Sequence, residues 1–176
     1  MNRRKFILGT ATVVGVSGAG AVAFTSASVA REVNIEVDTD DDAIVGLSAG
    51  NTGAASQEDG VLVIDTSVEQ NGLNLDSNFT FGQEETVETD HLFALTNNSS
   101  DEQDFELGFD TQSADGVATF GVYDGDNSEV GSFNGEDTVS VTLNEAETVY
   151  MIMTVDTDGL AENDDITGDF TIDVVA

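Results

Sequence analysis

The chain contains one histidine and no cysteine, which limits the chemistry that its side chains can carry out. A Ser-His-Asp triad would have to use His91, but no G-x-S-x-G sequence and no H-E-x-x-H sequence accompanies it. Asp65-Thr66-Ser67 resembles the Asp-Thr-Gly sequence of aspartic proteases, which need two such carboxylates. We therefore expect no enzyme and no catalytic residue, and we interpret His91 as a polar residue at a strand edge. The absence of cysteine excludes disulfides, thiolate metal sites and a lipid-modified cysteine anchor.

An acidic cluster near the start of the chain could bind a hard cation such as Ca²⁺ through its carboxylate oxygens. Asp38, Asp40 and Asp42 have the alternating spacing with which a calcium loop begins. An EF-hand, however, needs Gly at its sixth position and Glu at its twelfth. Those positions hold Ala43 and Ala49, so this cluster is not an EF-hand.

Two further carboxylate-rich turns have the same potential. Asp124 and Asp126 lie in one of them, and the run 163–165 (NDD) forms the other. In a chain this acidic, such clusters also arise from composition alone. We expect no dedicated cofactor, and at most Ca²⁺ or another cation held loosely at Asp38, Asp40, Asp42, Asp124 and Asp126.

Three N-x-[ST] sequences offer acceptor sites for N-linked glycans if the protein is exported. They begin at Asn78, Asn97 and Asn98, and the last two fall in the turn-forming run NNSS. We therefore treat these three asparagines as candidate glycosylation sites.

Charge is the most unusual property of the chain. It has 35 Asp and Glu residues against four Lys and Arg, three of which lie within the first five residues. Such charge repels the phosphates of nucleic acids and the surface of anionic membranes, because binding to them needs Lys and Arg. Disorder is the usual inference, but 39% of the residues are apolar and they alternate regularly. We interpret the composition as that of a halophilic protein, whose self-repulsion is screened by molar salt.

The N-terminal segment has the order of features of an export signal. Asn2–Leu8 (NRRKFIL) resembles the twin-arginine signal, and a weakly apolar run rich in Gly, Ala and Val follows it. We predict a signal peptide over residues 1–23, with cleavage as late as residue 30, then a flexible lead over 24–32. An uncleaved membrane anchor is the alternative, since the run is long enough to span a bilayer.

The remaining residues, 33–176, show a period-two pattern that places alternate residues on one face of a strand. The clearest cases are Val33–Val37, Phe105–Phe109, Val139–Leu143 and Val149–Val155. Eight to eleven strands at this spacing predict one antiparallel all-β sandwich. We expect Asn51–Gly60 to be a loop and Val61–Ile64 to be an inner strand, or one covered on both faces.

The segment AFTSASVAREVNIEVDTDDDAIVGL resembles the start of the haloarchaeal secreted proteins grouped as the DUF1102 family. LFALTNNSSDEQDFELGFD is similar to a strand, Asn-rich turn and strand of the TasA/camelysin superfamily. The resemblance is specific over about residues 20–47, moderate over 90–110, and limited to the strand pattern in the remainder. It implies a jelly-roll sandwich, export, and assembly into biofilm-matrix fibres or bundling pili through an N-terminal strand given to the next subunit.

Strand donation also follows from general physics, since a free strand can cap its own sheet or add to the edge of a neighbour. The stretch from Phe24 to Val29 is uncharged, which suits a contact between two negative surfaces. We therefore expect Phe24, Val29, Val33, Ile35 and Val37 to take part in assembly.

Together these features favour an extracellular or cell-surface structural protein whose expected partners are copies of itself and other surface proteins. A monomeric surface module that binds cations or glycans is the alternative. An exported hydrolase is the third class, and the residues favour it least. If the signal is cleaved, no stable membrane anchor is expected.

The charge interpretation predicts that the domain needs salt. Transfer from molar to low salt lengthens the Debye length from roughly 3 Å to 10 Å or more, so the repulsion between carboxylates increases. We expect the circular dichroism spectrum to lose its β-sheet signal, or the melting temperature to fall, at low ionic strength. An unchanged spectrum and melting temperature would contradict the halophilic interpretation.

Overall fold

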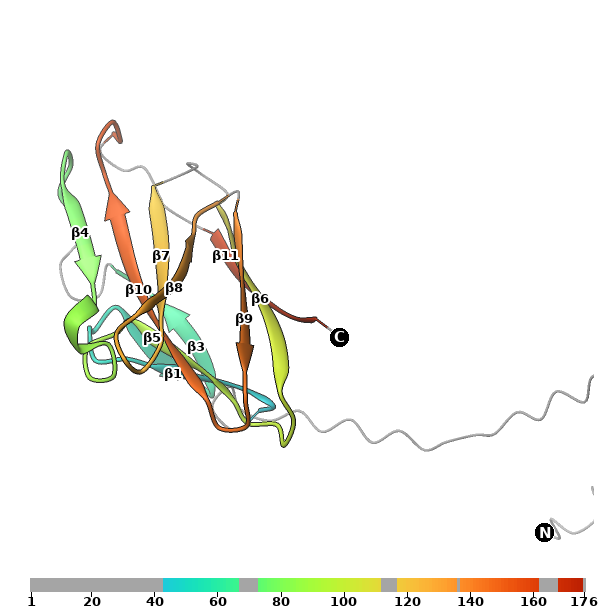
Figure 1. The fold of residues 1–176 in the computed structure, drawn as a ribbon. Helices are drawn as coiled ribbons and strands as arrows, with labels where there is room; N and C mark the ends of the chain where they lie inside the picture. Colours follow the sequence, from blue (N-terminus) through green and yellow to red (C-terminus); the bar gives the residue numbers. More distant parts are fainter. Residues whose placement is uncertain (1–42, 67–72, 112–116, 136, 162–167, 176) are drawn as a thin grey trace, which may run out of the picture. The chain divides into compact units, whose positions relative to one another are not determined.

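The computed structural model describes residues 43–66, 73–111, 117–135, 137–161 and 168–175. These residues form antiparallel strands and one short 3₁₀ turn (Figure 1). The elements are β1 (Val45–Ala49), β2 (Ala55–Glu58), β3 (Val61–Ile64), β4 (Asn78–Phe81), η1 (Glu84–Thr86), β5 (Phe93–Asn97), β6 (Gln103–Thr111), β7 (Ala118–Tyr123), β8 (Glu129–Phe133), β9 (Thr138–Leu143), β10 (Thr148–Asp156) and β11 (Gly168–Val175). The predicted all-β antiparallel class is confirmed.

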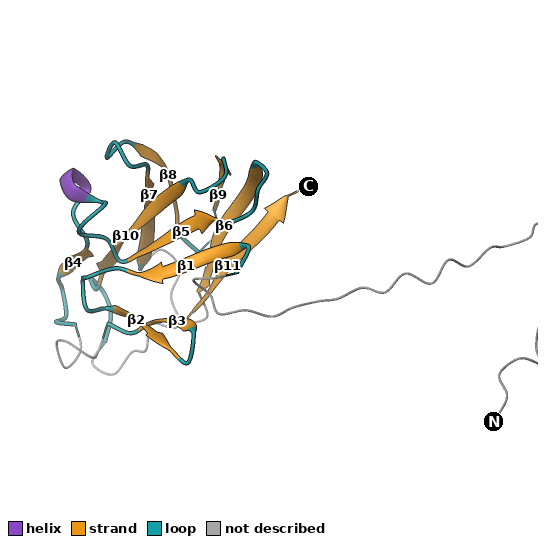
Figure 2. Cartoon of the chain, turned by 90° about the horizontal axis from the view of Figure 1, so that it is seen from below, coloured by secondary structure: helices purple, strands orange, loops and turns teal. Residues whose placement is uncertain are grey.

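The strands form two main sheets and a separate hairpin. The larger sheet has the order β1-β5-β10-β7-β8, and β4 pairs with β10 beyond the end of β5. The smaller sheet has the order β11-β6-β9, and β2 pairs only with β3 among the described strands. Figure 2 shows the two main sheets as layers and the hairpin at their side.

The pairing of the strands is nested, as in a long hairpin that has been rolled up. β7 pairs with β8, β6 with β9, and β5 with β10, so each outer pair encloses the one before it. Alternate pairs fall in different sheets, which is the arrangement of a jelly roll. The next pair outward would join β11 to a strand that precedes β5. β1 and β4 precede β5, but they pair with β5 and β10 instead.

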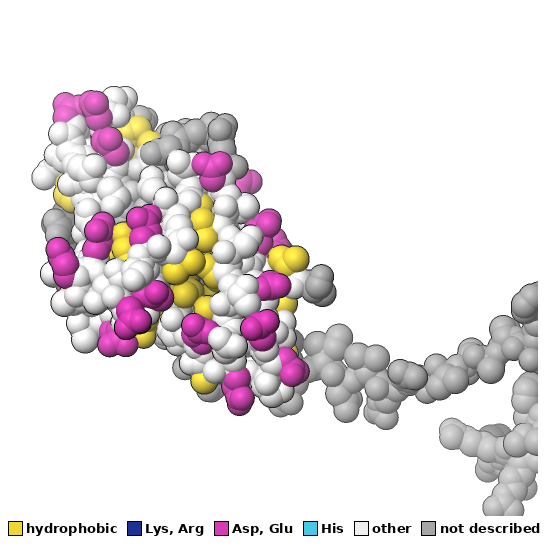
Figure 3. All heavy atoms as spheres, viewed as in Figure 1, with side chains coloured by type: hydrophobic (Ala, Val, Ile, Leu, Met, Phe, Trp, Pro, Cys, Tyr) yellow, Lys and Arg dark blue, Asp and Glu magenta, His cyan; other side chains and the backbone are white. Residues whose placement is uncertain are grey.

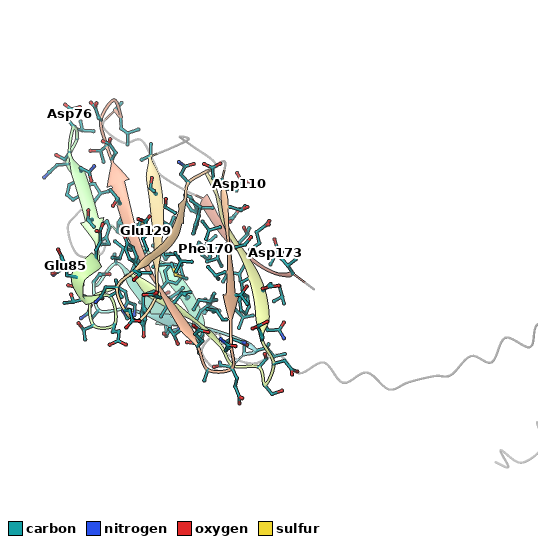
Figure 4. All side chains as sticks on the ribbon, viewed as in Figure 1. Asp76, Glu85, Asp110, Glu129, Phe170 and Asp173 are labelled. Atoms are coloured by element: carbon teal, nitrogen blue, oxygen red, sulfur yellow. The ribbon has the colours of Figure 1, made fainter. Side chains whose placement is uncertain are left out.

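A cluster of phenylalanines holds the two sheets together. Phe120 stacks on Phe133 at 5.3 Å, and Phe93 meets Phe170 edge to face at 5.0 Å. Phe109 completes the cluster from β6, with its ring 5.0 Å from that of Phe120. Phe93, Phe120 and Phe133 are fully buried, so strands of both sheets depend on the same core. Figure 4 shows Phe170 between the sheets, while Asp110 and Asp173 point outward.

The opposite faces of the strands carry the charge. No described Asp or Glu is fully buried, and the buried polar residues are Asn97 and Thr157. All four Lys and Arg precede residue 32, outside the described residues, so the described carboxylates have no Lys or Arg among them. Figure 3 shows Asp and Glu spread over one face of the sandwich, with apolar atoms exposed between them.

Two predictions about the first third of the domain were wrong. Asn51–Gly60, predicted as a loop, contains β2. Val61–Ile64, predicted as an inner or doubly covered strand, is β3 of the two-stranded hairpin, and Val61 is 55% exposed. Four apolar residues in a row indicated a covered strand, but β3 lies outside both main sheets and only its partner β2 pairs with it.

A smaller apolar cluster lies on the outer face of the larger sheet. Val87, which follows η1, is fully buried with Tyr123 and Ile152, and Tyr150 packs against them. The backbone N–H of Val87 donates to Oδ1 of Asn127, in the β7–β8 turn, at 3.0 Å. The η1 segment therefore covers part of a face that the strand pattern alone would leave open to solvent.

Candidate functional site

The residues expected to mediate assembly, Phe24, Val29, Val33, Ile35 and Val37, lie outside the described residues. The same is true of the first acidic cluster, formed by Asp38, Asp40 and Asp42, and of the run 163–165. Their roles remain predictions.

Asp124 and Asp126 lie in the turn between β7 and β8. Oδ1 of Asp124 accepts the backbone N–H of Asp126 at 2.9 Å and that of Ser128 at 2.8 Å. Asn127 adopts a left-handed φ of 62°, which such a tight turn requires. Asp124 thus has a structural role in the turn. Within the described residues, no group of three or more His, Asp or Glu side chains is placed to hold a metal ion.

His91 lies just before β5 and is partly buried. Its Nδ1 is 2.6 Å from the backbone oxygen of Val87. Because a carbonyl oxygen only accepts, Nδ1 carries the proton of this bond. The imidazole also contacts the ring of Tyr150 at 5.0 Å. Both contacts anchor the η1 segment to the outer face of the larger sheet.

Asn97 requires a correction as a glycosylation site. It is fully buried, and its Nδ2 donates to the backbone oxygens of Asp101 at 2.8 Å and Leu143 at 2.9 Å. Its Oδ1 accepts the backbone N–H of Ser99 at 3.0 Å. A glycan must be attached to Nδ2, so Asn97 is not accessible as an acceptor in the folded domain. The N-x-[ST] sequence at Asn97 arises because this structural asparagine is followed by a turn that contains serine.

The other two candidate acceptors are exposed. Asn98 follows β5, and its Nδ2 donates to the backbone oxygen of Ala43 at 2.8 Å. Asn78 begins β4, opposite Asp156 of β10. Of the three predicted acceptors, these two have the exposure that glycosylation needs.

The outer edge of β11 is the feature that sequence reasoning missed. β6 pairs with β11 along its whole length, from Gly168 opposite Thr111 to Val175 opposite Asp104. No described strand pairs with the other side of β11. Phe170 and Ile172 pack against the core, and by alternation Val174 faces the same way, yet it is 48% exposed. The edge thus ends in apolar side chains that the described part of the domain covers only in part.

Neither a known protein-family model nor a curated protein matches this chain. Within the described residues, no helix has the length and apolar character needed to cross a bilayer.

The two tyrosines of the chain both lie on the outer face of the larger sheet. Burial raises the pKa of Tyr123 to about 12, with further contributions from the charge of Glu84, a hydrogen bond to it and the charge of Glu129. Burial also raises the pKa of Tyr150, and the charge of Glu88 adds to this effect. Both phenols are therefore expected to stay protonated at a pH that ionises an exposed tyrosine.

The first prediction from this geometry concerns Asn97. Asn97→Ala removes three hydrogen bonds and leaves two backbone oxygens without their amide donor. We expect a loss of about 2–4 kcal/mol in the free energy of unfolding, measured by urea denaturation in molar salt. Asn78→Ala is the matched control, and at this exposed position we expect a change within about 0.5 kcal/mol. Equal losses in the two variants, or a glycan on Asn97 in mass spectrometry, would contradict the buried position.

The second prediction uses the tyrosines as probes, since the chain has no tryptophan to obscure their absorbance. The raised pKa means that folding favours the protonated phenol. Tyr123 therefore stabilises the fold below pH 10, and this contribution is lost between pH 10 and about 12. We expect tyrosinate absorbance to rise near pH 10 in the denatured chain and at a clearly higher pH in the folded protein. Tyr123→Phe should remove the ionisation that occurs at the highest pH. Titration curves that coincide for the folded and the denatured chain would contradict the prediction.

Proposed function

We propose that this protein is a secreted structural subunit of an extracellular fibre, pilus or biofilm matrix, assembled by pairing an N-terminal strand with a neighbouring copy. The observation that carries the proposal is the open edge of β11. This edge lies where the nested pairing of the roll calls for one more strand, and no described strand fills that place.

An unfilled edge presents N–H and C=O groups to any strand that can approach it. Proteins commonly protect such edges with charge, and β11 carries Asp173 on its outward face. On the inward face, however, Phe170, Ile172 and Val174 offer a row of apolar contacts. A strand with alternating apolar residues would extend both the hydrogen-bonded ladder and the core.

The N-terminal part of the chain has the sequence for such a strand. Val33, Ile35 and Val37 alternate with polar residues, and the stretch from Phe24 to Val29 carries no charge. A charged donor would bring more negative charge to an already acidic surface. The stretch from Phe24 to Val29 avoids that cost, and screening by molar salt would reduce the repulsion that Glu36 adds within Val33–Val37. If the subunits assemble only after export, they remain separate inside the cell.

We expect a charge at the end of the β11 edge to prevent assembly. Val174→Asp places a carboxylate where the incoming strand would pack, and the half-exposed position should tolerate it without unfolding. Val130→Asp is the matched control, because Val130 is 47% exposed on the edge strand β8. Electron microscopy of the secreted protein in molar salt should show filaments for the wild type and for Val130→Asp, but not for Val174→Asp.

Two outcomes would count against the proposal in different ways. Filaments of Val174→Asp as abundant as those of the wild type would exclude β11 as the accepting edge. A monodisperse monomer of the wild type at every concentration would overturn assembly itself and favour the monomeric binding module. Deletion of residues 24–32, with residues 1–23 kept for export, should also abolish filaments, while circular dichroism shows that the sandwich remains folded.

A further inference from the structure

The β2–β3 hairpin is a separate unit at the side of the sandwich. Its turn places Asp59 and Gly60 at φ values of 52° and 83°, which is typical of a tight two-residue hairpin. Neither strand pairs with another described strand. A two-stranded hairpin is marginally stable alone, so its position depends on what it packs against.

The hairpin packs on the core that the two main sheets share. Ala54 and Ala55 are buried, and Leu62 and Ile64 are partly buried against the same core as Phe170 and Ile172. Small side chains bury little apolar area, so Ala54 and Ala55 contribute less hydrophobic free energy than the larger buried residues of β5 and β10. The hairpin therefore covers the core with modest binding energy.

The hairpin lies on the side of the sandwich where β1 and β11 are the outermost described strands. β8 and β9 contact each other at one side of the sandwich, so the opposite side has β1 and β11 as the outermost strands of their sheets. The hairpin contacts β1, and the side-chain amide of Gln57 donates to the backbone oxygen of Leu47 at 2.6 Å. Figure 2 shows the hairpin next to β1, on this side of the sandwich.

We propose that the β2–β3 hairpin is a displaceable cover, which must move outward before a strand can fill the place beside β11. This inference rests on the proposed function, because it concerns how the same edge is exposed. An incoming strand would direct its apolar side chains into the core that Leu62 and Ile64 now cover. Opening of the hairpin would then limit the rate of assembly and keep the free subunit from pairing too early.

Hydrogen exchange on the secreted chain in molar salt tests the opening directly. We expect the amides of Ala55–Ile64 to exchange through openings at least about tenfold more frequent than those of β5 and β10. Gln57→Ala removes the contact with Leu47 and should raise hairpin exchange roughly fivefold. Ser56→Ala, at the adjacent exposed position, is the control and should leave exchange unchanged. Equal protection of the hairpin and of β10 would overturn the inference.

Assembly kinetics separate this inference from the proposed function. If the hairpin limits assembly, Gln57→Ala should form filaments faster than the wild type, and Ser56→Ala should match the wild type. Filaments that form at the same rate in all three proteins would overturn the proposed role of the hairpin while leaving the proposed function intact. The absence of filaments from every protein, whatever the exchange result, would overturn the proposed function and with it the role of the hairpin.

Discussion

The fold depends on keeping the described carboxylates in water, because no Lys or Arg lies among the residues that the structure describes. An unpaired charge is very costly to bury, so the core can contain apolar residues and only a few neutral polar groups. Asn97 and Thr157 are those groups, and hydrogen bonds satisfy both side chains. The strands therefore carry most of their apolar residues on the inner face and most of their Asp, Glu, Thr and Ser on the outer face, so the two sheets meet face to face.

The rolled topology turns this simple pattern into a particular surface. Nested pairs join strands that are distant in the sequence, such as β5 with β10, and place them side by side in one sheet. The nesting ends at β11, whose second neighbour is not among the described strands. One edge of a highly charged domain thus has an apolar inner face and no described strand paired along its outer side. The proposed assembly and the proposed role of the β2–β3 hairpin both follow from this interruption.

Polar residues that suggest chemistry in the sequence serve the fold in the structure. Asn97 links the end of β5 to Asp101 and Leu143, and Asp124 closes the β7–β8 turn with two backbone hydrogen bonds. His91 holds the η1 segment against Tyr150. Short motifs could not distinguish these roles from glycosylation or cation binding, because a motif does not specify burial or hydrogen-bond partners.

The sequence by itself determined the all-β class and the positions of β6, β9 and β10, since a period of two within a strand is a local property. It also determined the excess of acidic residues and the exclusion of thiol chemistry. Only the tertiary structure decided that Val61–Ile64 belongs to a separate hairpin, that Asn97 is buried, and that no described strand pairs with the outer side of β11. Alternation shows which residues share a face of a strand. It does not show which strands become neighbours, because that depends on contacts between residues far apart in the chain.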